Sequence, residues 1–521
     1  MPHTTKWMIN MPDLYEIACA AVKDKILGAW TGKAYGCMMG EPMEYRAQGE
    51  IYEGSLDIHP KAPTMWLHNE DDLYVNMALL EVVREKGLDA SVEDFAWVFR
   101  ESKFMLWHAN GQARQNIREG ISPRLSGHPL YNPHADDIDF QIECDFIGLI
   151  CPGMPQTASM IADRVGHIMN YGEGYYAGLF LASLYAAAFV ERDLLSIIAK
   201  ARMSIPADCD YAAMLADLLA WYEREPDDWR WTWQRIEDKW NFDFCPWAKT
   251  DTGRFNIQGH FNGLYILMGL LYGKGDYIKS ISICTRCGQD TDSNVGNCGG
   301  LLGTLMGFDA LPEIVKNELA PYMDRDYNFT SLSNISASEL CYQLALENAE
   351  RNGGKVNKEY IQIAVQPFEF LGKREQSFHN MEFVETYKTL DSAIKWYGEW
   401  NVEDVRKHQA GGEVVVSSST PGDYAEVVFN GTCIYMQGNL HSNYGMIEIY
   451  IDDEFVQRRD MFIECQWDNC LQSTAVWITG LESCQHTLKV VISEEKNGDS
   501  TGTEIALGRV VSYRGSVAPL P

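Results

Sequence analysis

The chain has 521 residues, of which 46% are hydrophobic and 22% are charged, a balance that excludes wholesale disorder and a membrane-spanning protein. One hydrophobic core no longer suffices at this length, so roughly two or three domains are expected. With 43 basic and 73 acidic side chains the formal charge is −30, which would repel a polyphosphate backbone. We therefore expect neither nucleic acid nor a membrane among the partners.

The N-terminal sequence, MPHTTKWMINMPDLYEIACAAVKDK, has no basic stretch followed by an apolar stretch and a small-residue cleavage site. The 14 cysteines are spread along the whole chain, as in proteins whose thiols stay free in a reducing compartment. We predict a cytoplasmic protein.

Apolar residues follow a helical spacing up to about residue 350. One predicted helix presents Leu73, Met77 and Leu80 on a single face, and Gly273 is predicted to end another. Ala- and Leu-rich runs repeat this pattern, and period-two alternation is missing. Residues 1–355 are therefore predicted to form an all-α domain.

The stretch RNGGKVNKEY interrupts the helical pattern, and β-rich sequence follows it. We assign residues 356–385 to a linker or to the first strands of the second domain, and residues 386–521 to an all-β, jelly-roll-like sandwich. Short apolar runs such as EVVVS, YAEVVF, MIEIYI and TLKVVI support this assignment, because turn residues such as Pro421-Gly422 separate them. The predicted fold is thus multidomain.

The first of two acidic clusters, Asn69-Glu70-Asp71-Asp72, directly precedes the helix that is predicted to begin near Leu73. Asn and Asp cap helix N-termini, and the helix dipole favours carboxylates in a first turn. On the residues alone, capping and a functional role are both open for this cluster.

The second cluster, Gly288-Gln289-Asp290-Thr291-Asp292-Ser293-Asn294, opens a glycine-lined helix. Two carboxylates at i and i+2 and a hydroxyl at i+3 are oxygen donors of the kind that Mg²⁺ and Ca²⁺ prefer. The cluster also matches the first half of an EF-hand loop. That alternative fails, because Leu301 stands where the loop needs a bidentate Glu.

Three segments in this order resemble the successive motifs of ADP-ribosylglycohydrolases of the dinitrogenase reductase-activating type: GAWTGKAYGCMMGEPMEY, NEDDLYVNMALLE and LLYGKGDYIKSISICTRCGQDTDSNVGNCGGLLGTLMG. The resemblance implies that residues 1–355 are a helical catalytic domain with two Mg²⁺ ions at its centre, Mn²⁺ or Ca²⁺ being alternatives. The metal ligands that it implies are Asp71, Asp72, Asp290, Asp292 and Ser293.

The chain departs from the family pattern around this expected site. Cys37 stands where the family usually has Asp, and Glu70 and Leu73 stand where it usually has Thr. Glu70 is therefore a possible additional ligand. Glu44 matches the glutamate that closes the first motif, which makes it a candidate for gating or for activating water, as Asp71 is.

The segment DDIDFQIECDFIGLICPGMP adds the carboxylates Asp136, Asp137, Asp139, Glu143 and Asp145 in a region where family members build their substrate pocket. We expect most of them to face solvent or to cap helices. Asp145 is the candidate for a contact with substrate or metal.

The C-terminal part resembles the galactose-binding-like modules that are attached to carbohydrate enzymes, which makes a carbohydrate a possible partner of the sandwich. Its aromatic residues could stack on sugars or fill the core, and alternating strand positions favour the core. The residues concerned are Trp396, Trp400, Tyr424, Tyr435 and Trp477.

The resemblance implies a magnesium-dependent glycosyl hydrolase that acts on a small ADP-ribosyl or furanosyl glycoside. Cleavage at the anomeric carbon passes through an oxocarbenium-like state and uses a water held by two metal ions, with Asp71 or Glu44 taking the proton. One alternative is a carbohydrate-directed glycoside hydrolase on the same scaffold. Another is a non-catalytic protein that binds metal and sugar.

Overall fold

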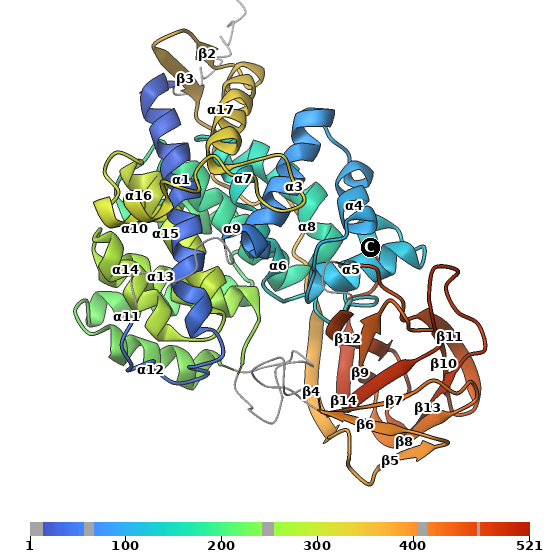
Figure 1. Cartoon of the computed structure of the whole chain (residues 1–521). Helices are drawn as coiled ribbons and strands as arrows, with labels where there is room; N and C mark the ends of the chain where they lie inside the picture. The colour runs from blue at the N-terminus through green and yellow to red at the C-terminus, as the bar shows by residue number, and fades with distance from the viewer. Residues whose placement is uncertain (1–13, 57–66, 242–254, 405–413, 466–468) are drawn as a thin grey trace, which may run out of the picture.

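The computed structural model describes residues 14–56, 67–241, 255–404, 414–465 and 469–521. These residues fold into a helical part, blue to yellow in Figure 1, and a C-terminal part made of antiparallel sheets, orange to red. The predicted multidomain fold, a helical bundle followed by a β-sandwich, is confirmed.

The helical part centres on two helices, α9 and α13, that are buried along their entire length because apolar residues surround them on every side. The sequence predicts a stop at Gly273, and α13 ends there. Among the described residues, no helix is both long and apolar enough to cross a bilayer. In chain order the helices are α1 (Cys19–Gly40), α3 (Asp71–Lys86), α4 (Val92–Glu101), α5 (Ala109–Arg118), α6 (Asp139–Glu143), α7 (Asp145–Leu149), α8 (Pro155–Met169), α9 (Gly172–Ala188), α10 (Leu194–Arg202), α11 (Asp210–Arg224), α12 (Trp229–Trp240), α13 (Gly259–Gly273), α14 (Tyr277–Cys287), α15 (Thr291–Met306), α16 (Glu313–Leu319) and α17 (Asn334–Arg351), with 3₁₀ turns η1 (Glu41–Met43) and η2 (Pro123–Leu125).

Helices α1 and α15 touch backbone to backbone along a line of glycines, which we call the glycine seam. A methyl group on Gly32 would lie 2.2 Å from the carbonyl oxygen of Gly299, and one on Gly28 would lie 2.4 Å from that of Gly303. No Cβ atom tolerates a backbone oxygen that close, so only glycine permits this approach. The seam fixes the end of α1 beside the start of α15.

A small antiparallel sheet, which the sequence prediction of an all-α domain missed, joins the two ends of the helical part. Strand β3 (Tyr360–Ala364) lies between β1 (Leu14–Ala18) and β2 (Lys355–Val356). Since β3 belongs to the helical part and β4 (Phe378–Tyr387) pairs with a strand of the sandwich, the chain passes from one part to the other over residues 365–377.

The C-terminal part contains two antiparallel sheets with an apolar core between them. One has the strand order β11-β10-β13-β8-β5, and the other has the order β12-β9-β14-β7-β6, with β4 also paired to β14. Val427 and Ile449 of the first sheet and Met436 and Val510 of the second are at most 2% exposed. The strands are β5 (Ile394–Tyr397), β6 (Asn401–Asp404), β7 (Val414–Ser418), β8 (Tyr424–Gly431), β9 (Cys433–His441), β10 (Met446–Ile451), β11 (Glu454–Asp460), β12 (Asn469–Ile478), β13 (Cys484–Ile492) and β14 (Ile505–Val517).

Of the five aromatic residues considered for sugar stacking, two are buried and three are partly buried. Tyr435 is 0% exposed and Trp477 is 5% exposed. Trp396 and Trp400 are partly buried against the core of the sandwich, and Tyr424 is partly buried on β8. Binding of a carbohydrate by this part stays a prediction.

Apolar side chains cross the boundary between the two parts. Met105, from the loop before α5, is 1% exposed and belongs to the hydrophobic core of the sandwich, and Trp107 packs against the same core. In the other direction, the indole N–H of Trp477 donates to the carbonyl oxygen of Pro129 at 2.9 Å. The two parts therefore bury each other's surface.

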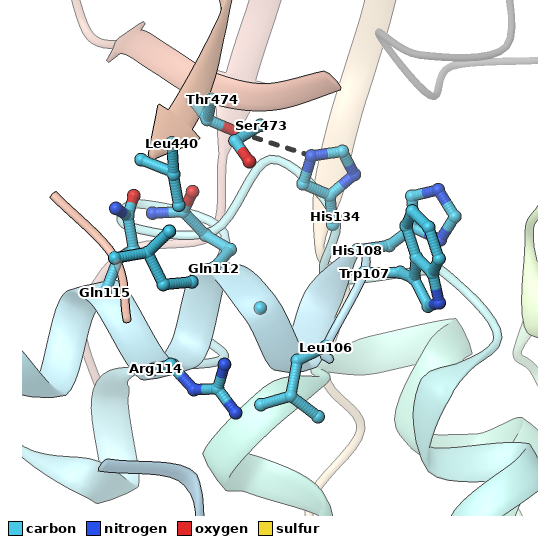
Figure 2. A pocket seen from close by; sticks show the side chains of 12 residues that line it. Leu106, Trp107, His108, Gln112, Arg114, Gln115, His134, Leu440, Ser473 and Thr474 are labelled. Atoms are coloured by element: carbon cyan, nitrogen blue, oxygen red, sulfur yellow. Dashed lines mark hydrogen bonds between the residues drawn. The ribbon is translucent and has the colours of Figure 1, made fainter. Parts of the chain in front are cut away.

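Polar contacts also cross this boundary (Figure 2). The hydroxyl of Thr474 lies 3.4 Å from the His134 ring, and the buried guanidinium of Arg459 donates to Gln115 at 3.2 Å and pairs with Glu119 at 3.4 Å. The cavity that remains between α5 and the sandwich has a volume of about 10 Å³, which is room for about one water. The boundary is thus closely packed.

The glycine seam predicts that replacing one of its glycines with alanine destabilises the protein, which is the opposite of the usual effect in a helix. Replacing a helical glycine with alanine normally stabilises a protein by about 0.4–1 kcal/mol. We expect Gly32→Ala to lower the free energy of unfolding by about 2 kcal/mol or more, because α1 and α15 must separate. Thermal unfolding followed by circular dichroism measures this. Gly498→Ala, where nothing lies within 4 Å of the added methyl, is the control, and equal midpoints for both variants would contradict the seam.

The shared boundary predicts that Met105 stabilises both parts. We expect Met105→Ala to cost about 2–5 kcal/mol, the usual cost of truncating a fully buried methionine. Denaturant unfolding should be a single transition in the wild type and should separate into two in the variant. Met160→Ala, at a side chain that is 57% exposed, is the matched control. A Met105 variant as stable as this control would show that the parts are independent.

Candidate carboxylate site

The turn that leads into α15 is tied to the segment that follows α1. Gly288 and Gln289 have φ angles of 84° and 62°, and the Gln289 N–H donates to the carbonyl oxygen of Ala47 at 2.9 Å. The Thr291 hydroxyl donates to the carbonyl oxygen of Gly40 at 2.8 Å. Together with the glycine seam, these bonds bring the residues after Gly40 against the first turn of α15.

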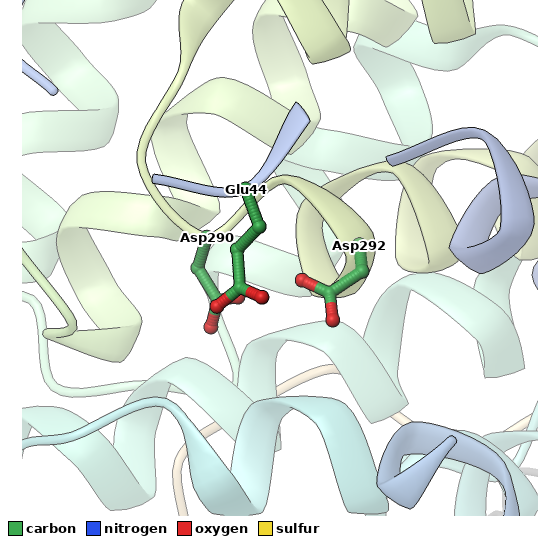
Figure 3. Close-up of side chains that lie close together, drawn as sticks. All are labelled: Glu44, Asp290 and Asp292. Atoms are coloured by element: carbon green, nitrogen blue, oxygen red, sulfur yellow. The ribbon is translucent and has the colours of Figure 1, made fainter. Parts of the chain in front are cut away.

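The first group of carboxylates consists of Glu44, Asp290 and Asp292. One oxygen of each lies within 4.8 Å of the others, and Figure 3 shows the side chains of Glu44 and Asp290 converging opposite Asp292. Glu44 follows η1, whereas the two aspartates come from the start of α15. The structure therefore places Glu44 beside the two aspartates, and its roles in gating or in activating water stay predictions.

The second group consists of Glu70, Asp72 and again Asp292, whose oxygens also lie within 4.8 Å of one another. Ser293 is adjacent, because its hydroxyl donates to Asp72 Oδ2 at 3.0 Å. Asp71 belongs to neither group but lies beside Glu70, to which it is hydrogen-bonded. The sequence-predicted residues of both clusters thus meet around Asp292.

Burial and mutual repulsion control the charge of these groups. Burial first, and then the charge of Asp292, raises the pKa of Glu44, Glu70 and Asp290 well above the usual range. The same two causes raise the pKa of Asp71 to about 7. Asp292 Oδ1 has no hydrogen-bond partner among the described residues. Buried carboxylate oxygens with few hydrogen-bond donors around them fit hard divalent cations.

Asp145 lies behind Asp72 and is not open to a substrate. Its Oδ1 accepts from Tyr185 at 2.6 Å and from Asn297 at 3.2 Å. Its Oδ2 accepts from Lys33 at 2.8 Å and from Asn76 at 3.2 Å. With both oxygens occupied, Asp145 has the environment of a structural carboxylate.

The other carboxylates of the 136–145 segment are buried, so the expectation that most of them face solvent or cap helices is wrong as far as solvent is concerned. Capping is right for Asp139, whose oxygens accept the N–H groups of Ala109 and Asn110 at the start of α5 at 3.1 Å each. Glu143 accepts from the Asn110 amide, and its Oε2 has no partner among the described residues.

Two residues near the site were not singled out as site residues from the sequence. Lys33 is 1% exposed and contacts Asp72 and Asp145. A lysine inside the mostly apolar, glycine-containing first motif is the signal that could have indicated it. Glu143 was named only as one of several acidic residues. No local pattern distinguishes it, since its burial arises from helix packing.

The chain matches a family model described as ADP-ribosylglycohydrolase over residues 18–346. No curated protein matches it. A solved structure described as an ADP-ribosylglycohydrolase-related protein complex is 14% identical with a TM-score of 0.42, and the match covers 63% of this chain and 99% of that one.

Two further similarities are to carbohydrate-active proteins. A family two carbohydrate esterase from Cellvibrio japonicus is 16% identical with a TM-score of 0.19, over 27% of this chain and 36% of that one. The CBM36-1 domain of a xylanase from the hindgut metagenome of Trinervitermes trinervoides is 11% identical with a TM-score of 0.18, over 27% of this chain and 100% of that one. None of these scores reaches 0.5, so the assignment rests on the family model. Since that model spans more than half of the chain, the chain belongs to the ADP-ribosylglycohydrolase family and is a glycohydrolase.

Proposed function

We propose that the protein is a divalent-cation-dependent hydrolase that cleaves the glycosidic bond at the anomeric carbon of a small ribosyl or furanosyl glycoside. The observation that carries the proposal is the pair of carboxylate groups that share Asp292. Family membership supports the reaction class, and the carboxylates support the cation.

Two Mg²⁺ ions would be held by Glu44, Asp290 and Asp292 on one side and by Glu70, Asp72 and Asp292 on the other. All of these donors are oxygens, the atoms that Mg²⁺, Mn²⁺ and Ca²⁺ prefer. When bound, such ions orient the sugar hydroxyls and lower the pKa of water.

Asp71 is the carboxylate that we assign to proton transfer. It lies outside both groups and is partly exposed, so it stays available to take a proton from water. An attacking water forms the new bond to the anomeric carbon and gives its proton to Asp71. The bond to the leaving group breaks through an oxocarbenium-like state, and the leaving atom takes a proton from solvent water, to which Asp71 then returns the proton that it accepted.

The shared residue provides the sharpest test. We expect Asp292→Asn to lower kcat/KM by about a hundredfold or more and to remove Mn²⁺ binding, because it weakens both groups at once. Isothermal titration and hydrolysis assays with and without a chelator measure the two effects. Asp453→Asn, on an exposed turn, is the charge-matched control. Undiminished turnover of Asp292→Asn in metal-free buffer would refute the proposal.

The substrate is settled by a panel of glycosides. Comparing kcat/KM for ADP-ribosyl-arginine, ADP-ribosyl-serine, O-acetyl-ADP-ribose and aryl furanosides orders the candidates. Turnover of oligosaccharides alone would favour the carbohydrate-directed alternative. Cation binding without any turnover would favour the non-catalytic one.

A further inference from the structure

A lysine ammonium lies inside the carboxylate site. Lys33 follows Gly32 in α1 and is 1% exposed. Its Nζ donates to Asp145 Oδ2 at 2.8 Å and to the carbonyl oxygen of Ile142 at 2.9 Å, and it lies 3.4 Å from Asp72 Oδ1. These three oxygens match the three N–H donors of an ammonium. Lys33 is therefore a fixed cation with no access to water.

The charge of Lys33 is balanced from the side away from the cation site. Asp145 is held by Tyr185, Asn297 and Asn76 in addition to Lys33, so it stays in place as a buried counter-ion. Burial alone would lower the pKa of Lys33, but Asp145 and Asp72 hold it above its usual value. The Lys33–Asp145 ion pair thus places a permanently charged ammonium group next to Asp72.

The two carboxylate groups differ in this respect. Asp72 belongs to the group with Glu70 and Asp292, and one of its oxygens faces Lys33 while the other accepts from Ser293. Within the described ranges, no ion pair with Lys, Arg or His reaches Glu44, Asp290 or Asp292. Among these residues the group with Glu44 therefore has no fixed counter-charge, whereas the group with Glu70 has the ammonium of Lys33.

We propose that Lys33 makes the two cation positions unequal, so that the group of Glu44 binds a divalent cation tightly and the group of Glu70 binds a second one weakly. The ammonium competes for Asp72 Oδ1 and repels a second positive charge, and both effects are strong away from water. This inference rests on the proposed cation site. Weak binding makes the second cation exchangeable, so the occupancy of its position depends on the free cation concentration.

The test titrates the full-length protein with Mn²⁺ and measures free Mn²⁺ by electron paramagnetic resonance. We expect two classes of site whose Kd values differ by about tenfold or more, which corresponds to about 1.4 kcal/mol. The double variant Lys33→Met/Asp145→Asn removes the ion pair at unchanged net charge and similar size. It should tighten the weak class by about tenfold and leave the tight class within about twofold. The same exchange at a remote pair, Lys200→Met/Glu191→Gln, should change neither class.

Single variants assign the classes even where the double variant fails to fold. Asp290→Asn should remove the tight class, and Glu70→Gln should remove the weak one. The reverse assignment, equal Kd values in the wild type, or an unchanged weak class in a folded double variant would overturn the role of Lys33 while the cation site stands. Absence of all Mn²⁺ binding in the wild type would overturn both.

Discussion

The glycine seam between α1 and α15 is the contact on which the carboxylate site depends. Because Gly28 and Gly32 have no Cβ, the carbonyl oxygens of Gly299 and Gly303 can approach the backbone of α1. The end of α1 then lies against the first turn of α15, where Thr291 donates to the carbonyl oxygen of Gly40. Glu44 can meet Asp290 and Asp292 only because the two helices are this close.

This close packing brings several carboxylates together, and their mutual repulsion destabilises the fold unless a positive charge balances it. Burial and repulsion raise the pKa of Glu44, Glu70 and Asp290, so the cation-free site holds protons up to a higher pH than separate, exposed carboxylates would. A cation that displaces these protons adds its binding free energy to that of folding. Lys33 opposes this effect at Asp72, although burial still raises the pKa of Asp72 well above its usual value.

The sequence predicted what depends on local spacing and could not predict what depends on distant partners. Helical and alternating periodicity gave the two parts, and the Asp290 to Ser293 motif gave half of the carboxylate site. The pairing of Leu14 with Ala364 joins strands too short to show a period of their own. The side chain of Met105 belongs to the core of the sandwich, but no pattern in the sequence around it indicates this. Such contacts arise from tertiary packing, which periodicity does not record.

The sandwich is connected to the site through one segment of chain. The hydroxyl of Tyr74, on the helix that carries Asp72, donates to the carbonyl oxygen of Met105 at 2.7 Å, while the side chain of Met105 lies in the core of the sandwich. A few residues later, the N–H of Asn110 is held by Asp139. Because the backbone of this segment supports the site and its side chains anchor the sandwich, the sandwich is part of the scaffold that holds α3 in position.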